Sequence, residues 1–266
     1  MENMNDERPK FFNLFTESFS YYLPILKVAF PLILLFRLPG ILFSEALHEL
    51  WLPKNLKTME QIEASMGVFV NFTIIQSLLE ILFGTIVSIA IIKAILARRE
   101  NKPIKATQVL KEAFPLWTEG IATIFIMTLI LILLSYLLII PAIIWGIFYI
   151  FTLYVVAIEG IGGRAALKRS KSLVKGHWFE VFAYVLIINI ALFFVGIVMM
   201  FPTGFLVGAL EALKEQSWIH SGFWYYGLNI FFNSMGSVIF HLVFVFNIIF
   251  MTLYFLDSVR LEKKPI

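Results

Sequence analysis

The chain has 266 residues, 60% of which are apolar or aromatic, compared with about 45–50% in soluble domains even when glycine is counted. Only 15% of the residues are charged, and the mean hydropathy is +0.87, so an ordinary soluble fold is excluded and the surface is expected to face lipid. The formal charge of +3 is too small to indicate a nucleic-acid partner, and the absence of cysteine excludes disulfides, thiolate metal sites and cysteine nucleophiles.

Six apolar segments are long enough to cross a bilayer, which takes about 20 helical residues. The 39 residues between Glu119 and Glu159 contain no Asp, Glu, Lys or Arg, and as one helix they would rise about 58 Å. This stretch must therefore cross twice, with Pro141 near the reversal, while Pro53 and Pro202 are expected at outer ends of spans. The predicted spans are residues 21–43, 68–92, 121–138, 142–158, 181–201 and 226–256. We predict an all-α polytopic membrane protein with a single integral membrane domain, residues 1–266.

The distribution of basic residues predicts the orientation. An even number of spans places both termini on one side of the membrane. With the N-terminus inside, the cytoplasmic segments carry 16 of the 21 basic residues and the outer segments carry 3. Because cytoplasmic loops are enriched in Lys and Arg, both termini are predicted to be cytoplasmic, and anionic headgroups are the expected lipid partners.

An amphipathic segment precedes the first, third and fifth spans, and each is predicted to form a short interfacial helix. The first carries an aromatic stripe (Phe12, Phe15, Phe19 and Tyr22), and the second an aliphatic stripe (Ala106, Val109, Leu110 and Ala113). The third has an apolar face (Ala166, Leu167, Leu173 and Val174) and a basic face (Arg164, Lys168, Lys171 and Lys175, beside Arg169). These five basic residues are the candidates for contact with lipid headgroups.

The three segments suggest an internal repeat. Each ends in an aromatic residue, namely Tyr22, Trp117 or Trp178, and each is followed by a span and a return span. The pattern favours three units of interfacial helix, span and return span. The alternative is that basic, aromatic-tipped cytoplasmic loops are common in membrane proteins and carry no repeat.

A motif lies between the fourth and fifth spans. A Glu ends a span and leads through glycines to an Ala-Leu-x-Arg-Ser helix, which is followed by Leu, Gly and an aromatic residue that enters the next span. This run resembles the membrane domain of bacterial glycerophosphoryl diester phosphodiesterases and related six-span proteins. The matching positions are Glu159, Gly162 or Gly163, Ala166, Leu167, Arg169, Ser170, Leu173, Gly176 and Phe182. Lys171 departs from the family, which usually has an aromatic residue there.

The resemblance implies a membrane module rather than an enzyme. The hydrolase activity of that family belongs to a separate soluble barrel with paired His and carboxylate metal ligands, for which this chain has no room, and the chain lacks a His-Arg-Gly motif. The resemblance therefore implies a location in the bacterial cytoplasmic (inner) membrane, and no catalytic residue, metal or cofactor is predicted.

Polar residues also occur inside the predicted spans. Arg37 and Glu80 lie at nearby depths, so they are predicted to pair, whereas Lys27 can reach the cytoplasmic headgroups. A structural ion pair that fixes helix register is favoured over a proton relay or a site for a cationic headgroup. Polar and small residues repeat every four positions on the second span (Gln76, Glu80, Gly84 and Ser88) and the sixth (Asn229, Asn233, Ser237 and His241). They predict helix packing, and the alternative is a polar cavity between spans one, two and six.

Together these features predict a non-enzymatic integral membrane module that engages lipid or a partner protein. The alternative is a transporter or permease component whose polar site lies around Glu80 and Arg37. A membrane-spanning or laterally open cavity reaching Glu80 would favour transport, whereas a dry, packed centre would favour the module.

Overall fold

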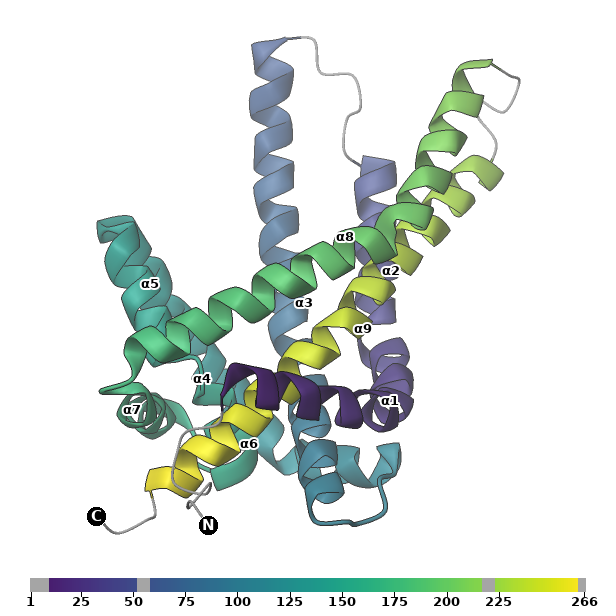
Figure 1. Ribbon diagram of the computed structural model, residues 1–266. Coiled ribbons are helices and arrows are strands. Elements are labelled where there is room, and N and C mark those ends of the chain that lie inside the picture. Colours follow the sequence, from purple (N-terminus) through teal and green to yellow (C-terminus); the bar gives the residue numbers. More distant parts are fainter. Residues whose placement is uncertain (1–9, 52–57, 217–222, 263–266) are drawn as a thin grey trace.

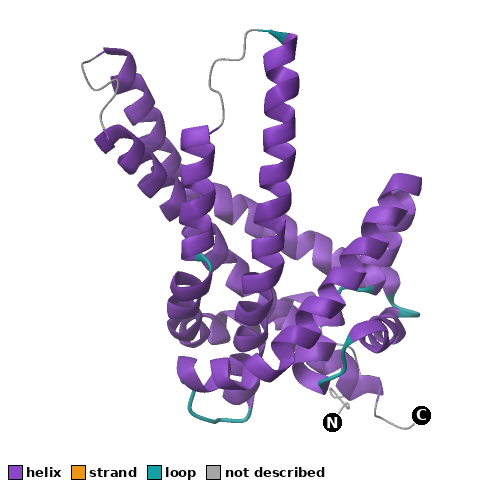
Figure 2. Cartoon of the chain, turned by 180° about the vertical axis from the view of Figure 1, so that it is seen from behind, coloured by secondary structure: helices purple, strands orange, loops and turns teal. Residues whose placement is uncertain are grey.

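The computed structural model describes residues 10–51, 58–216 and 223–262. Within these ranges the chain forms nine helices and no strand (Figures 1 and 2). The helices are α1 (Phe11–Phe36), α2 (Leu38–Trp51), α3 (Met59–Arg99), α4 (Ala106–Leu137), α5 (Ile139–Phe148), α6 (Thr152–Glu159), α7 (Gly163–Val174), α8 (Trp178–Gln216) and α9 (Phe223–Glu262). The predicted all-α fold is confirmed.

Six helical stretches are long and apolar enough to cross a membrane, which agrees with the predicted number of spans. They are Phe11–Phe36, Ser65–Arg99, Ala106–Leu137, Ile139–Glu159, Trp178–Leu213 and Trp224–Glu262. All of them extend beyond the predicted boundaries on at least one side. Pro202 lies inside α8 rather than at its outer end, so that part of the prediction is wrong, while Pro53 lies outside the described residues. Prolines inside membrane helices are tolerated because neighbouring groups satisfy the freed carbonyls.

Two helices are interrupted within the predicted spans. The first span, predicted as residues 21–43, breaks at Arg37, where α1 ends and α2 begins. Pro39 cannot donate a backbone hydrogen bond, and a proline disfavours helical geometry at the residue before it, which explains an interruption here. The fourth span is divided into α5 and α6 around Tyr149 and Phe151.

The three amphipathic segments do not all form separate helices. The first and second run without interruption into the following spans as parts of α1 and α4. Only the third is a short helix of its own, α7. Figure 1 shows α7 end-on while α3 runs up the view, so α7 lies across the direction of α3.

The core lies where α1, α3, α6, α7 and α9 meet. Apolar side chains of these helices are fully buried, including Ile33, Ile89, Val155, Val174 and Ile249. Aromatic rings link α6 to α9, because the ring of Phe151 lies 5.6 Å from those of Tyr254 and Phe255. Burial of these side chains stabilises the end of the bundle at which α3 and α9 finish.

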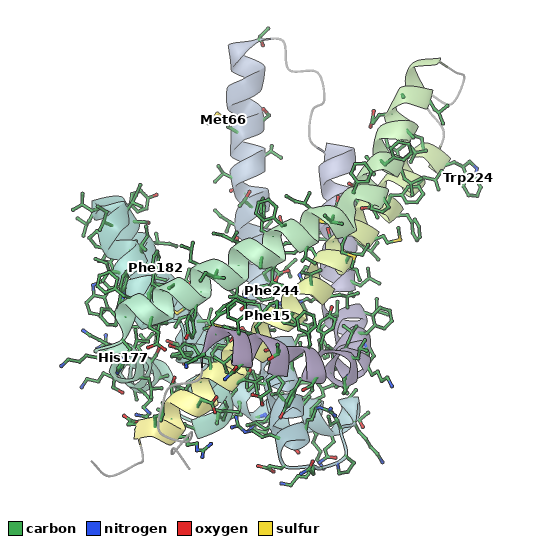
Figure 3. The ribbon with its side chains drawn as sticks, viewed as in Figure 1. Phe15, Met66, His177, Phe182, Trp224 and Phe244 are labelled. Carbon is green, nitrogen blue, oxygen red and sulfur yellow. The ribbon has the colours of Figure 1, made fainter. Side chains whose placement is uncertain are left out.

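The outward faces are apolar as well. Met66 on α3 and Trp224 on α9 are 60% and 81% exposed, and Figure 3 shows apolar side chains projecting from the long helices. At the tip of the α4–α5 hairpin, Tyr136 is 86% exposed and Ile139 is 71% exposed. Exposed apolar surface of this extent fits hydrocarbon as the solvent.

Three hydrogen bonds link the units of the suggested repeat in a closed cycle. The Trp117 indole donates to the carbonyl of Leu82 over 2.7 Å, so the second unit is tied to the return span of the first. The Trp178 indole donates to the carbonyl of Ile144 over 3.1 Å, which ties the third unit to the second. The Tyr22 hydroxyl closes the cycle by donating to the carbonyl of Leu242 over 3.1 Å. The three equivalent contacts support the three-unit interpretation.

Candidate functional site

Helix α7 and its flanking turns contain the motif between the fourth and fifth spans. Gly162 is the N-cap of α7, and its lack of a side chain leaves room for the Glu119 carboxyl group, which a Cβ there would displace. Gly176, just after the helix, has φ +88°, a left-handed conformation that favours glycine. The N–H of Gly163 donates to the Thr123 hydroxyl over 2.6 Å. The motif glycines therefore fix the turns that orient α7 against α4.

Helix α7 has two distinct faces, as the sequence predicts. Its apolar residues, Ala166, Leu167, Leu173 and Val174, are all buried. On the opposite side, Arg164, Lys168 and Lys175 are exposed. Since the apolar face is already packed against the bundle, the helix is held with these three cations outward.

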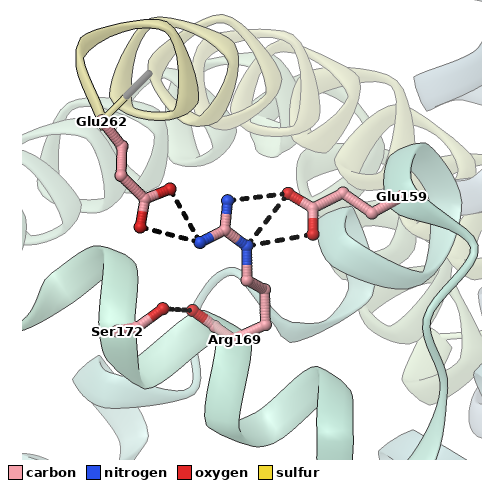
Figure 4. Close-up of polar contacts among 4 residues, drawn as sticks. All are labelled: Glu159, Arg169, Ser172 and Glu262. Carbon is pink, nitrogen blue, oxygen red and sulfur yellow. Dashed lines mark hydrogen bonds and ion pairs between the residues drawn. The ribbon is translucent and has the colours of Figure 1, made fainter. Parts of the chain in front are cut away.

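Arg169 does not belong to this exposed basic face, contrary to the prediction. Its guanidinium lies between two carboxyl groups, 3.0 Å from Glu159 at the end of α6 and 2.7 Å from Glu262 at the end of α9 (Figure 4). Nε and Nη2 both donate to Glu159, while Nη1 donates to Glu262. The hydrogen bond with Glu159 raises the pKa of Arg169, outweighing the effect of burial. Because two carboxylates neutralise it, Arg169 joins helices rather than presenting charge to lipid.

Lys171 is also partly withdrawn from the predicted face. Its ammonium lies 4.1 Å from the centre of the Trp145 ring and 5.5 Å from that of Phe148, both on α5. These are cation–π contacts. The lysine at this position therefore packs on aromatic rings of the neighbouring helix.

Ser170, the next residue of the motif, bridges the interruption between α5 and α6. Its hydroxyl donates to the carbonyl of Phe148 over 2.8 Å and accepts from the N–H of Phe151 over 3.1 Å. The side chain is fully buried, so it supplies partners for two backbone groups at an interrupted helix within the bundle.

A second polar site lies within the membrane-spanning helices, where Arg37 pairs with Glu80 as predicted. Nη1 of Arg37 is 2.5 Å from Oε2 of Glu80. Nε2 of His241, on α9, is 3.4 Å from the other carboxyl oxygen. Spans one, two and six therefore meet at these three residues.

The space beside this pair is small. A cavity of about 30 Å³ is lined by Arg37, Glu80, Gln76 and Gly84, among others. Gly84 leaves room for the guanidinium, since a Cβ there would lie 2.8 Å from Nη2 of Arg37. The cavity accommodates about two water molecules and no metabolite.

The remaining polar residues of α9 belong to a different cluster. Asn233 donates to the side chain of Asn229 over 2.5 Å, and Asn229 donates to Glu211 of α8 over 3.4 Å. Tyr225 also donates to Glu211. The predicted polar face of α9 is thus divided between two sites, one with α3 and one with the outer end of α8.

Sequence reasoning missed several of these partners. Glu262 is 93 residues from Arg169 and carries no local signal for the contact. Asn189 and Asn247, which pair over 3.1 Å between α8 and α9, are isolated polar residues in apolar runs, and that isolation was the available signal. Among the residues that the structure describes, no group of three His, Asp or Glu side chains is arranged to hold a metal ion.

Comparison of the chain with protein-family models, with curated proteins and with solved structures gives no match.

Proposed function

We propose that this protein is a non-enzymatic module of the bacterial cytoplasmic membrane, with both termini in the cytoplasm, that binds anionic lipid headgroups through α7. The observation that carries the proposal is the pairing of a buried apolar face with three exposed cations, Arg164, Lys168 and Lys175, on a helix that lies across α3 (Figure 1). A helix of this kind at a membrane surface directs its cations to phosphate groups.

The likeness to the glycerophosphoryl diester phosphodiesterase membrane domain supports the proposal at the level of the motif. Gly162, Arg169, Ser170 and Gly176 all hold α7 in place, through turns, an ion-pair network and a helix bridge. A motif with this structural role fits a family that shares a membrane scaffold rather than a reaction.

Lipid binding is tested with a triple variant, Arg164→Gln, Lys168→Gln and Lys175→Gln. Each basic residue near an anionic surface contributes about 1 kcal/mol, so the loss of three is expected to weaken binding about 100-fold. Native mass spectrometry of the detergent-purified protein, titrated with phosphatidylglycerol, measures the affinity. Phosphatidylcholine serves as the neutral comparison lipid.

The matched control keeps the charge: Arg164→Lys, Lys168→Arg and Lys175→Arg is expected to bind phosphatidylglycerol like the wild type. Circular dichroism establishes that both triple variants retain their helical content. Equal phosphatidylglycerol affinity in the wild type and the Gln variant would overturn the proposal.

A transporter or permease component is the second candidate, because Arg37, Glu80 and His241 form a charged site at membrane depth. A path for substrate would have to open from the cavity of about 30 Å³ beside that site. If the protein acts as a lipid-binding module, Glu80→Gln leaves growth and lipid composition unchanged in a strain that needs the protein. A growth defect with normal protein levels would favour transport.

A further inference from the structure

Glu80 contacts two partners with its two carboxyl oxygens. Oε2 is 2.5 Å from Nη1 of Arg37, at the junction of α1 and α2, and Oε1 is 3.4 Å from Nε2 of His241, on α9. Glu80 itself lies in α3, so three separate segments of the chain contribute one ionisable side chain each. The side chains of Arg37 and His241 are only 11% and 16% exposed.

The second nitrogen of the His241 ring determines where the protons lie. Nδ1 is 2.7 Å from the carbonyl oxygen of Ser237, one turn earlier on α9. A carbonyl oxygen can only accept a hydrogen bond, so Nδ1 carries a proton. In a neutral ring Nε2 would then carry no proton, and it would lie 3.4 Å from the Oε1 atom of Glu80.

An ionised Glu80 and a bare Nε2 would place two acceptors opposite each other. Their repulsion is removed by one additional proton, held either on Nε2 of His241 or on the Glu80 carboxyl group. In both cases Arg37, Glu80 and His241 together carry one net positive charge, and without the proton they are neutral. The geometry therefore favours the form that has bound a proton.

Other charged groups on the helices packed against α9 do not take part. The hydrogen bonds and ion pairs described for Arg37, Glu80 and His241 join these residues to one another and to the Ser237 carbonyl. The charged residues elsewhere on α1, α2, α3 and α8 include Lys27, Glu45, Lys93, Glu180 and Glu211. None of these appears in the contacts of the site, so its net charge is set by its own three members.

A cavity large enough for water adjoins the site. The cavity beside Arg37 and Glu80 is also lined by Ser44 and Gln76, and its volume of about 30 Å³ holds about two water molecules. Glu80 is among the residues that line the cavity, so water held there would lie beside the carboxyl group and would exchange protons with it.

We propose that Glu80 and His241 share an intramembrane proton-binding site, with Arg37 as the fixed counter-charge of the carboxylate. The proton comes from cavity water and forms an N–H bond at Nε2 or an O–H bond at Oε1, and no other bond changes. Binding alters the net charge at the interruption between α1 and α2. The site is separate from α7, so the proton-binding proposal is tested independently of lipid binding by α7.

Nuclear magnetic resonance of the full-length protein in lipid nanodiscs tests the site. The protein is labelled with ¹⁵N-histidine, and His241→Asn identifies the His241 signals among those of the four histidines. Infrared spectroscopy of the same samples detects a protonated carboxyl group. At neutral pH the wild type is expected to show either two protonated ring nitrogens on His241 or a carboxylic-acid band that Glu80→Gln removes.

In Glu80→Gln, the His241 ring is expected to have a single protonated nitrogen, because the amide can donate to a bare Nε2. The matched control Glu211→Gln removes a carboxyl group from the other cluster on α9 and is expected to leave the His241 signals unchanged. Glu80→Asp, which keeps a carboxyl group, provides a second variant if the amide variant fails to fold. A wild-type His241 ring with one N–H beside an ionised Glu80, throughout pH 5 to 9, would overturn the proposal.

Discussion

At the scale of single residues, Arg169 has the densest set of charged contacts in the described chain. It joins the ends of α6 and α9 from its position on α7. Removing the cation would leave the carboxyl groups of Glu159 and Glu262 facing each other without a counter-charge. The three side chains are between 19% and 45% exposed, so water partly screens this repulsion.

Arg169→Gln is therefore expected to lower the free energy of unfolding by about 1–3 kcal/mol. The measurement is a denaturant titration of the purified protein in mixed micelles. Arg169→Lys keeps the charge but cannot bind both carboxyl groups through a planar fork, so it should recover only part of the loss. A Lys variant as unstable as the Gln variant would show that geometry, and not charge, determines the effect.

The residue-level predictions succeeded where the position of a residue along its span, and hence its depth in the membrane, is enough to identify its partner. Arg37 and Glu80 were predicted to pair because each was costly to bury alone and their depths coincide in antiparallel helices. Arg169 was predicted to contact lipid headgroups, but its carboxylate partner Glu262 is supplied by the last turn of α9. Helical periodicity places a side chain on a face but does not identify the helix opposite that face.

At the scale of elements, the interruption between α5 and α6 depends on Ser170. Its hydroxyl donates a hydrogen bond to the carbonyl of Phe148 and accepts one from the N–H of Phe151. Both backbone groups would lose this partner in Ser170→Ala. We expect this variant to lose about 1–3 kcal/mol of stability, since the site is fully buried. Denaturant titration in mixed micelles measures the loss.

Ser172→Ala is the matched control, because that hydroxyl is exposed and bonds only to the carbonyl of Arg169 within α7. It is expected to change stability by no more than about 0.5 kcal/mol. Similar losses in the two alanine variants would contradict the assigned role of Ser170.

The continuity of α1 and α4 was not predictable from the hydrophobic pattern. The pattern distinguishes an amphipathic segment from an all-apolar one, but it does not reveal whether the backbone turns between them. Pro24, Pro31 and Pro115 all lie inside these helices, so proline was not a reliable marker of a helix end. The separate helix α7 was predictable because glycines lie on both sides of it.

At the scale of the whole molecule, the cycle of aromatic hydrogen bonds predicts three equivalent contributions to stability. Trp117→Phe, Trp178→Phe and Tyr22→Phe each remove one donor to a backbone carbonyl and keep most of the ring. Each is expected to cost about 0.5–1.5 kcal/mol. Because the three sites lie at different interfaces, the losses in the triple variant should add.

The same titration in mixed micelles measures the three single variants and the triple variant. Phe125→Leu provides a comparison, since this ring on α4 is exposed and a phenyl ring makes no hydrogen bond to a backbone carbonyl. If the triple variant loses much less stability than the sum of the three single losses, the contacts are not independent. One variant carrying nearly the whole loss would contradict their equivalence.

The orientation in the membrane is the last consequence of the charge distribution. The C-terminal ends of α3 and α9 lie together beside the first half of α1, since Arg99 pairs with Asp257 and Arg98 donates to the Ser20 carbonyl. Helix α7 joins this end of the bundle through the ion pair of Arg169 with Glu262. The positive-inside rule predicts that this basic end faces the cytoplasm. Because the chain has no native cysteine, single cysteines can report the side of each position without background.

We expect a membrane-impermeant maleimide to label Ala212→Cys, near the C-terminal end of α8, in intact cells. It should label Ser172→Cys, on α7, only after the cells are permeabilised. Both residues are exposed, so access to reagent rather than burial decides the result. Labelling of Ser172→Cys in intact cells, with Ala212→Cys protected, would reverse the orientation and place the cations of α7 away from the anionic cytoplasmic leaflet.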